Sequence, residues 1–128
     1  MTTNLEVVQA VYEAFKRQDL ATLLAAFDSS AEIDQSELVP WGGRYRGLEG
    51  VQSFLGALMS HVESVVEVEE IFDAGDRIVQ IGRSRGRVHA TGSEFDTREV
   101  HIWKVREGKI VDLKIFLDLP AMLGALGR

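Results

Sequence analysis

The spacing of hydrophobic residues changes midway along the chain, from a helical period to a strand-like alternation. In residues 5–17 apolar side chains recur at every third or fourth position, so they share one side of a helix. A second, shorter helix is predicted over 19–27, with Asp19 as its N-cap, and a third over 48–62. The first half of the chain is therefore expected to be mainly helical.

The second half alternates apolar and polar residues, the pattern of strands that bury one face. Short turns that contain Gly, such as REGK, separate these segments. The strands are expected at 64–73, 77–92, 95–105 and 110–119. A last turn of helix is expected at 120–127, where Asp118 is placed to cap it.

The segment between the two halves carries turn-forming residues. Residues 31–38 predict a short strand, and residues 39–50 contain one Pro and four Gly, which predicts a long ordered loop. Helices followed by long alternating strands indicate an α+β fold. We expect three N-terminal helices packed in a strongly curved, antiparallel sheet of four to six strands in mixed order, in a single domain over 1–128.

Composition excludes several classes of function. The chain has 128 residues with 45% hydrophobic and 27% charged residues, as expected of one globular domain. It has no cysteine, and its three histidines lack the spacing of a metal site, so neither a metal nor another cofactor is expected. The net charge of −6 argues against nucleic acid. Neither a membrane-spanning run nor a signal segment is seen, which predicts a cytoplasmic protein.

Three separated blocks of the sequence carry a resemblance to a known superfamily. They are residues 8–33 (VQAVYEAFKRQDLATLLAAFDSSAEI), 42–55 (GGRYRGLEGVQSFL) and 101–118 (HIWKVREGKIVDLKIFLD). In order and spacing the chain resembles the nuclear transport factor 2-like superfamily, and within it the SnoaL-like and ketosteroid isomerase-like proteins. The resemblance implies a cone-shaped, cystatin-like fold with a mostly apolar pocket, and a homodimer formed through the outer face of the sheet.

The resemblance also indicates where functional residues would lie. Steroid isomerases use an aspartate base on the first strand, a tyrosine from the first helix and a protonated aspartate on a late strand. In this chain the corresponding positions are Gln35, Val11 and His101. The carboxylate that limonene epoxide hydrolases carry in the last strand falls near Ile115. Neither of these named activities is therefore expected, because the residues at the functional positions differ. The fold alone does not determine the chemistry.

His101 is the main candidate for chemistry. The strand alternation places it on the same inward face as Glu99 and Trp103, where a side chain that titrates near neutral pH can act as a base. A nearby carboxylate would fix its tautomer, and we predict Asp34 as the partner, with Glu99 as the other candidate. The alternative is that His101 is a buried neutral imidazole with a purely structural role.

Further residues are expected to line the pocket or close its mouth. Tyr12 is one position from the family's tyrosine and can instead belong to the core. Trp41 and Tyr45 lie in the glycine-rich loop and can act as a lid over a hydrophobic ligand, or simply close one end of the core. The predicted ligand-contacting residues are Tyr12, Phe15, Gln35, Trp41, Tyr45, Glu99, Trp103, Leu113 and Ile115.

Arg83, Arg85 and Arg87 share one face of their predicted strand, which raises the possibility of a phosphate site. Glu67 and Glu69 on the preceding strand offer a simpler explanation, because they can form cross-strand ion pairs with these arginines. This face is then expected to be the outer one.

Two functions follow from these features. The first is a cofactor-free enzyme that transfers protons on a small hydrophobic molecule, in an isomerisation, cyclisation or hydration, through His101 and a carboxylate. The second is a small-molecule binding module or a dimeric interaction domain without chemistry, which the missing isomerase residues favour.

Overall fold

The computed structural model describes residues 2–128. The helices are α1 (Asn4–Lys16), α2 (Leu20–Ala25), α3 (Gly47–His61) and α4 (Leu119–Ala125). Three of them begin at a side-chain cap, because Thr3, Asp19 and Asp118 each accept a hydrogen bond from a backbone N–H of the first turn. The helices predicted from the hydrophobic period, and the caps at residues 19 and 118, are thereby confirmed.

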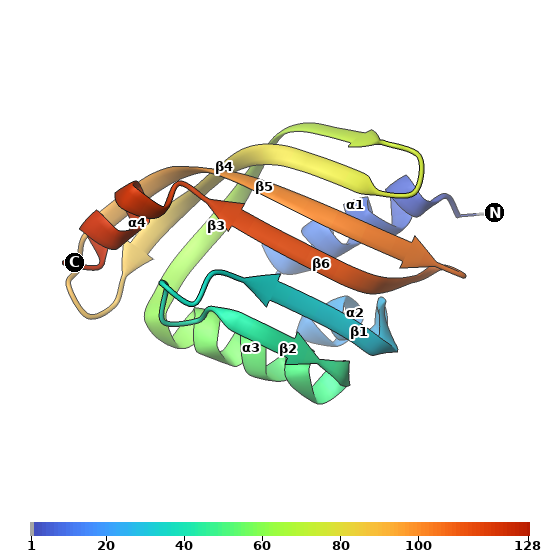
Figure 1. The fold of residues 1–128 in the computed structure, drawn as a ribbon, viewed down its shortest axis with the longest axis horizontal. Coiled ribbons are helices and arrows are strands. Elements are labelled where there is room, and N and C mark those ends of the chain that lie inside the picture. Colours follow the sequence, from blue (N-terminus) through green and yellow to red (C-terminus); the bar gives the residue numbers. More distant parts are fainter. Residues whose placement is uncertain (1) are drawn as a thin grey trace.

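Six strands form one curved sheet that does not close into a barrel (Figure 1). The strands are β1 (Phe27–Gln35), β2 (Gly43–Arg46), β3 (Val62–Asp73), β4 (Ile78–Val88), β5 (Glu94–Arg106) and β6 (Lys109–Leu117). Their order across the sheet is β2-β1-β6-β5-β4-β3. The last four strands form the predicted antiparallel meander, and the α+β fold class is confirmed.

Two features of the sheet differ from the expectation. β1 pairs with β6 in the parallel direction, so the sheet is mixed rather than purely antiparallel. Strand β2 lies inside the segment predicted as a loop, and it pairs with the end of β1 over residues 43–46. The ion pairs Arg46–Glu32 (2.8 Å) and Arg44–Asp34 (3.6 Å) follow this register. Pairing with a neighbouring strand stabilises residues whose local sequence favours a turn.

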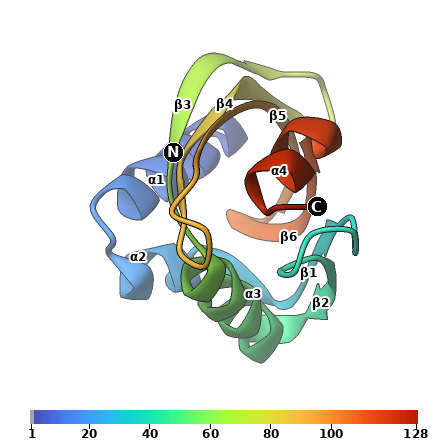
Figure 2. The same cartoon turned by 90° about the vertical axis from the view of Figure 1, so that its left-hand side faces the viewer.

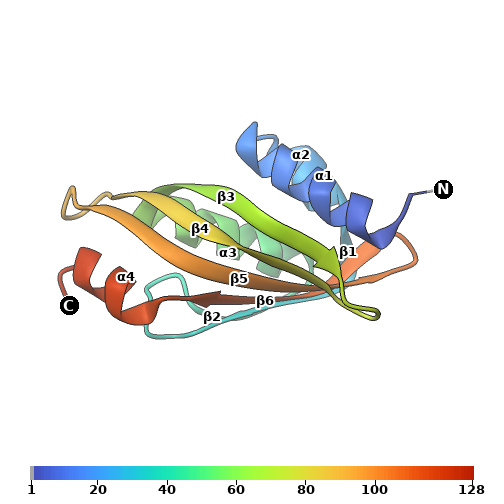
Figure 3. The same ribbon diagram turned by 90° about the horizontal axis from the view of Figure 1, so that it is seen from above.

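The helices and the concave face of the sheet enclose the core. Viewed from the end where α4 lies, the sheet curls around the interior while α1, α2 and α3 cover its open side (Figure 2). α4 lies at the opposite end of the molecule from the N-terminus (Figure 3). α1 contributes Val8, Val11 and Ala14 to the core, and α3 contributes Val51 and Phe54. The amphipathic pattern thus determines which side of each helix faces the sheet.

The outer face of the sheet carries the arginines. Arg85 pairs with Glu67 as expected, at 3.0 Å. Asp96 on β5 is the other main partner, at 2.6 Å from Arg83 and 3.3 Å from Arg85. The predicted charge pairing is thus confirmed for Glu67, whereas Asp96 on β5 takes the role that had been predicted for Glu69.

Within residues 2–128, no helix is both long and apolar enough to span a bilayer.

Candidate active site

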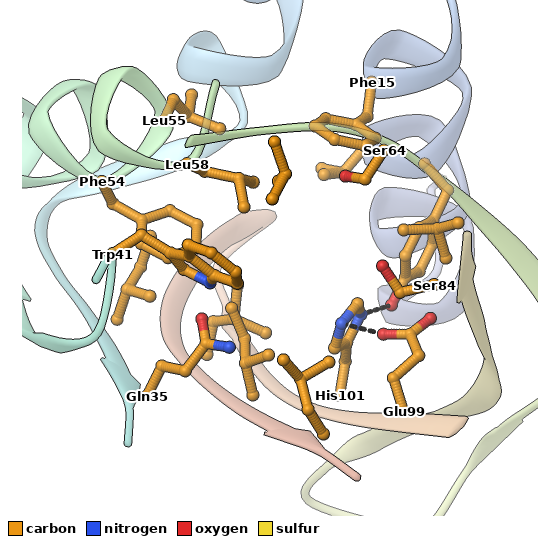
Figure 4. Close-up of a pocket in the computed structure, with 18 of the residues that line it drawn as sticks. Phe15, Gln35, Trp41, Phe54, Leu55, Leu58, Ser64, Ser84, Glu99 and His101 are labelled. Atoms are coloured by element: carbon orange, nitrogen blue, oxygen red, sulfur yellow. Dashed lines mark hydrogen bonds and ion pairs between the residues drawn. The ribbon is translucent and has the colours of Figure 1, made fainter. Parts of the chain in front are cut away.

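A cavity of about 100 Å³ lies between the concave face of the sheet and the helices (Figure 4). Its walls are mainly aliphatic and aromatic side chains from α1, α3 and the inner faces of β1, β5 and β6. A few polar side chains also reach it, namely Tyr12, Gln35, Ser64, Ser84, Glu99 and His101. An apolar cavity with a few polar groups is the usual character of a small-molecule site.

Strand register brings the main polar groups of the site into one row. Gln35 on β1 pairs with Ile115 on β6, Ile115 pairs with His101 on β5, and His101 pairs with Gln80 on β4. Residues paired in register point to the same side of a sheet, so all four side chains face the interior. The row therefore carries polar groups across an otherwise apolar surface.

Tyr12 reaches this row from helix α1. Its hydroxyl oxygen lies 2.7 Å from Nδ1 of His101 and accepts a hydrogen bond from Nε1 of Trp103 at 2.8 Å. An indole N–H can only donate, so the tyrosine hydroxyl hydrogen is available for Nδ1. Nε2 of Gln80 also lies 3.2 Å from Nδ1. Two donors converge on this nitrogen, which assigns the imidazole hydrogen to Nε2.

Glu99 is the carboxylate that contacts His101. Its Oε2 pairs with Nε2 of His101, and its Oε1 accepts a hydrogen bond from Nε2 of Gln80 at 3.2 Å. The Glu99 side chain is 1% exposed and that of His101 is 11% exposed. A buried carboxylate is costly unless it is paired and hydrogen-bonded; here Oε1 accepts the hydrogen bond from Gln80, while Oε2 has no hydrogen bond and is paired with the His101 imidazole. Opposite Glu99, the lack of a side chain at Gly82 leaves room for the Gln80 amide.

Burial fixes the protonation state of Tyr12. It raises the pKa of the Tyr12 hydroxyl far above its usual value of 10.0, and the negative charge of Glu99 adds to the increase. The hydrogen bond from Trp103 acts in the opposite direction but is the weaker effect. Tyr12 is therefore a neutral hydrogen-bond donor at physiological pH.

Two predicted placements are wrong. Asp34 was expected to partner His101, but it lies on the other face of β1 from Gln35, where it pairs with Arg44 and is 40% exposed. Adjacent residues of a strand point to opposite faces, so Asp34 cannot face the cavity together with Gln35. Tyr45 does not line the cavity, because its ring packs against Phe54 and its hydroxyl donates to the carbonyl of Trp41.

The remaining predicted ligand-contacting residues lie in the cavity wall. They are Tyr12, Phe15, Gln35, Trp41, Glu99, Trp103, Leu113 and Ile115. Whether they contact a ligand stays a prediction. Trp41 is 2% exposed and tilts against His61, so it forms a fixed wall rather than an external lid.

Gln80 is part of the site and was not singled out from the sequence. It is fully buried and hydrogen-bonds to both Glu99 and His101. The sequence feature that could have indicated Gln80 is its position as a polar residue on the inner face of a strand, a face that also carries Ile78 and Val88.

Among residues 2–128 no three His, Asp or Glu side chains come together as ligands for a metal ion.

Comparison with known proteins identifies the fold and the family. The crystal structure of an NTF2-like protein from Burkholderia thailandensis E264 matches with a TM-score of 0.91 and 29% identity, covering 98% of each chain. A putative polyketide cyclase from Pseudomonas putida KT2440 shares the fold, with a TM-score of 0.82 and 19% identity over 98% of each chain. The curved sheet with helices on its concave side is thus an NTF2-like fold.

Residues 8–113 match the model of the SnoaL-like domain, and the chain belongs to this family. An uncharacterized protein of Mycobacterium tuberculosis H37Rv is similar, with 29% identity over 120 residues, covering 92% of this chain and 91% of the relative. The superfamily resemblance inferred from the three sequence blocks is confirmed.

Proposed function

We propose that the chain is a cofactor-independent enzyme that binds a small, mostly apolar carbonyl compound and moves a proton at the carbon next to the carbonyl. The observation that supports this proposal is the connected set Tyr12, His101 and Glu99 in the wall of an apolar cavity. A base oriented by a carboxylate, with a neutral hydroxyl donor beside it, is the combination that enolisation needs. The match to a putative polyketide cyclase is compatible with such chemistry, although at 19% identity it shows only the fold.

The hydrogen-bond pattern supplies a sequence of steps. The Tyr12 hydroxyl, which donates to Nδ1 of His101, turns to the carbonyl oxygen of the bound compound. Nδ1 then keeps only the longer contact with Nε2 of Gln80, at 3.2 Å, and this contact must also be released. The Nδ1 lone pair accepts a proton from the adjacent carbon, while the C–H electron pair moves to the carbonyl oxygen as an enolate. Tyr12 stabilises the enolate oxygen, and Glu99 stabilises the imidazolium through Nε2–H.

The enolate then determines the overall reaction. Return of the proton to another carbon of a conjugated system gives an isomerisation, whereas attack of the enolate on a second carbonyl closes a ring. In both outcomes the proton that His101 takes from carbon is returned to the product, so no oxidant, reductant or metal is needed.

The cavity limits the size of the compound, because about 100 Å³ is less than the roughly 150 Å³ of an apolar cavity that holds benzene. Compounds larger than a single ring are therefore not expected to be substrates.

Hydrogen exchange at carbon tests the chemistry directly. Cyclohexanone incubated with the protein in deuterium oxide should exchange its α-hydrogens faster than in buffer, as followed by proton NMR. His101→Gln should remove this acceleration. His89→Gln is the matched control, because His89 lies at an exposed turn after β4 and does not line the cavity. Acceleration that survives in His101→Gln would refute the assigned base.

A binding module without chemistry is the second proposal. It is favoured by the fact that both nitrogens of His101 are already engaged, Nδ1 by Tyr12 and Gln80 and Nε2 by Glu99. In that case cyclohexanone would bind and shift the NMR signals of cavity residues, but the protein would not accelerate exchange. Absence of both binding and exchange would contradict both proposals.

We also propose that two copies associate through the outer face of the sheet. Phe116 on β6 is 52% exposed and lies in register with Val100 on β5, which lies in register with Ile81 on β4. These side chains form an apolar row on the outer face, beside the paired charges of Arg83 and Asp96. A second copy that presents the same row would cover it, as a two-fold interface requires.

A further inference from the structure

We infer that Gln35 recognises a hydroxyl or N–H group of the ligand, at the end of the cavity away from His101. This inference rests on the proposed small-molecule site and specifies the class of compound that would occupy it. The compound is a six-membered ring, or one of similar size, that carries a carbonyl group and a hydrogen-bond donor across the ring from it.

The unpartnered amide oxygen of Gln35 is the first observation. Gln35 is 6% exposed, and its Oε1 is buried with no hydrogen-bond partner among residues 2–128. Leaving a buried acceptor without a partner costs free energy, so such groups in folded proteins usually have one. The side chain lines the cavity, and its amide is directed into it (Figure 4). A ligand in the cavity can therefore supply the missing donor.

Three other buried polar atoms serve as a comparison. Oγ1 of Thr97, Oε1 of Gln80 and Oε2 of Glu99 also lack a hydrogen-bond partner in the part of the chain that is described. Neither Thr97 nor Gln80 lines the cavity. Glu99 does line it, but its Oε2 is paired with Nε2 of His101. Of these four atoms, Oε1 of Gln35 is therefore the one that belongs to a cavity-lining residue and has no polar partner of either kind.

The spacing of the strands sets the size of the ligand. Gln35 and His101 are in the same cross-strand row with β6 between them. Neighbouring strands lie about 4.8 Å apart, so the two backbones are roughly 10 Å apart. The carbonyl oxygen accepts from Tyr12, whose hydroxyl lies 2.7 Å from Nδ1 of His101, and the donor at the other end of the compound reaches Oε1 of Gln35. Two hydrogen bonds of about 2.8 Å each then leave roughly 4 Å between the two polar atoms of the compound. Two oxygens in a 1,3- or 1,4-relation on one ring meet this separation approximately, whereas two oxygens on one carbon are too close.

The rest of the cavity fits a ring between these two polar ends. Ile115 lies between Gln35 and His101 on the sheet, and Phe54, Leu55 and Leu58 of α3 also line the cavity. These side chains offer no hydrogen bonds, so they favour an apolar middle section. A donor at Gln35 also orients the ring, because the carbonyl group is then directed toward Tyr12 and His101.

Three ring ketones test the inference. Cyclohexanone has no second polar group, 4-hydroxycyclohexanone has a donor, and 4-methoxycyclohexanone has only an acceptor at the same position. Their dissociation constants are measured by NMR titration of the full chain. We expect the hydroxy compound to bind about 10-fold more tightly than the methoxy compound, because it alone donates to the free Oε1.

Gln35→Leu should abolish this preference, so that the hydroxy and methoxy compounds bind with equal dissociation constants. Gln35→Met is a second variant of similar length in case the first folds poorly. Gln52→Leu, on the exposed side of α3, is the matched control and should keep the preference. If cyclohexanone binds but the hydroxy and methoxy compounds bind equally, or if the preference persists in Gln35→Leu, the role of Gln35 is refuted while the proposed site stands. If none of the three compounds binds, the proposed site and this inference both fail.

Discussion

The hydroxyl of Tyr12 lies 2.7 Å from Nδ1 of His101, although 89 positions separate the two residues in the sequence. Their rings are also nearly parallel, with an interplanar angle of 6° and centroids 5.8 Å apart. The contact joins helix α1 to strand β5 in the wall of the cavity. It fixes the orientation of the imidazole and supplies it with a donor that a bound carbonyl oxygen can take over.

Replacing Tyr12 with Phe should lower both stability and the proposed activity. The variant leaves Nε1 of buried Trp103 without an acceptor and removes one donor at His101, so we expect a loss of about 1–3 kcal/mol in the free energy of unfolding. Urea denaturation measures this loss, and the α-hydrogen exchange of cyclohexanone should slow at the same time.

Tyr45→Phe is the matched control for this variant. The Tyr45 hydroxyl donates to the backbone carbonyls of Trp41 and Gly42, and Tyr45 itself does not line the cavity, so its removal should affect stability but not exchange. Equal loss of exchange in the two variants would show that the effect of Tyr12→Phe is a general loss of folding.

The burial of Tyr12 also predicts a pH dependence of stability. The folded state raises the pKa of Tyr12 above the unfolded value of 10.0, so this hydroxyl keeps its proton in the folded protein after the unfolded chain has lost it. The stability that depends on the neutral hydroxyl is complete below pH 10.0 and decreases as the pH rises further. Above that pH the advantage of the wild type over Tyr12→Phe should decrease by about 1.4 kcal/mol per pH unit.

Denaturation of both proteins between pH 8 and 11 measures this difference. The comparison cancels the titration of other groups that the two proteins share. A difference in stability that is constant through this range would show that Tyr12 ionises equally easily in both states.

Glu99 and His101 should depend on each other for stability. His101→Leu leaves the Glu99 carboxylate buried without its imidazole partner, and the expected cost is about 3–5 kcal/mol. Glu99→Leu leaves Nε2–H of His101 and the Gln80 amide without an acceptor and should also be destabilising. The double variant removes both polar groups and should be more stable than His101→Leu alone.

A double-mutant cycle of unfolding free energies, with the fold of each variant checked by circular dichroism, measures this coupling. Additive effects would mean that the two side chains do not interact. A double variant that is stable but does not accelerate hydrogen exchange would separate the contribution of this pair to chemistry from its contribution to folding.

The position of His101 followed from the sequence because it depends on local alternation. Arginine and lysine on one side of the strand required the other side to face inward, and the structure has His101, Glu99 and Trp103 buried on that side. The same alternation shows why the placement of Asp34 was wrong. Asp34 and Gln35 are neighbours on one strand, so only one of them can face the cavity.

Contacts between elements could not be predicted in this way. The bond from Tyr12 to His101 depends on how α1 lies across the sheet, and the row from Gln35 to Gln80 depends on the parallel pairing of β1 with β6. Parallel pairing leaves no local signal, because the two strands come from opposite ends of the chain. Gln80 illustrates the consequence, since its partners became evident only from the register of β4 with β5.

Replacing Phe116 with Glu should convert the proposed dimer into a monomer. Phe116 is 52% exposed on the outer face, and a carboxylate placed in its row would be buried opposite the same row of a second copy. Desolvation of that charge opposes association, while the fold should be unaffected because the side chain faces away from the core. Sedimentation velocity of the wild type and the variant measures the change in mass.

Leu38→Glu is the matched control. Leu38 is 58% exposed but lies in the loop between β1 and β2, so this variant should leave the dimer intact. A wild-type chain that sediments as a monomer at high concentration would refute the proposed interface.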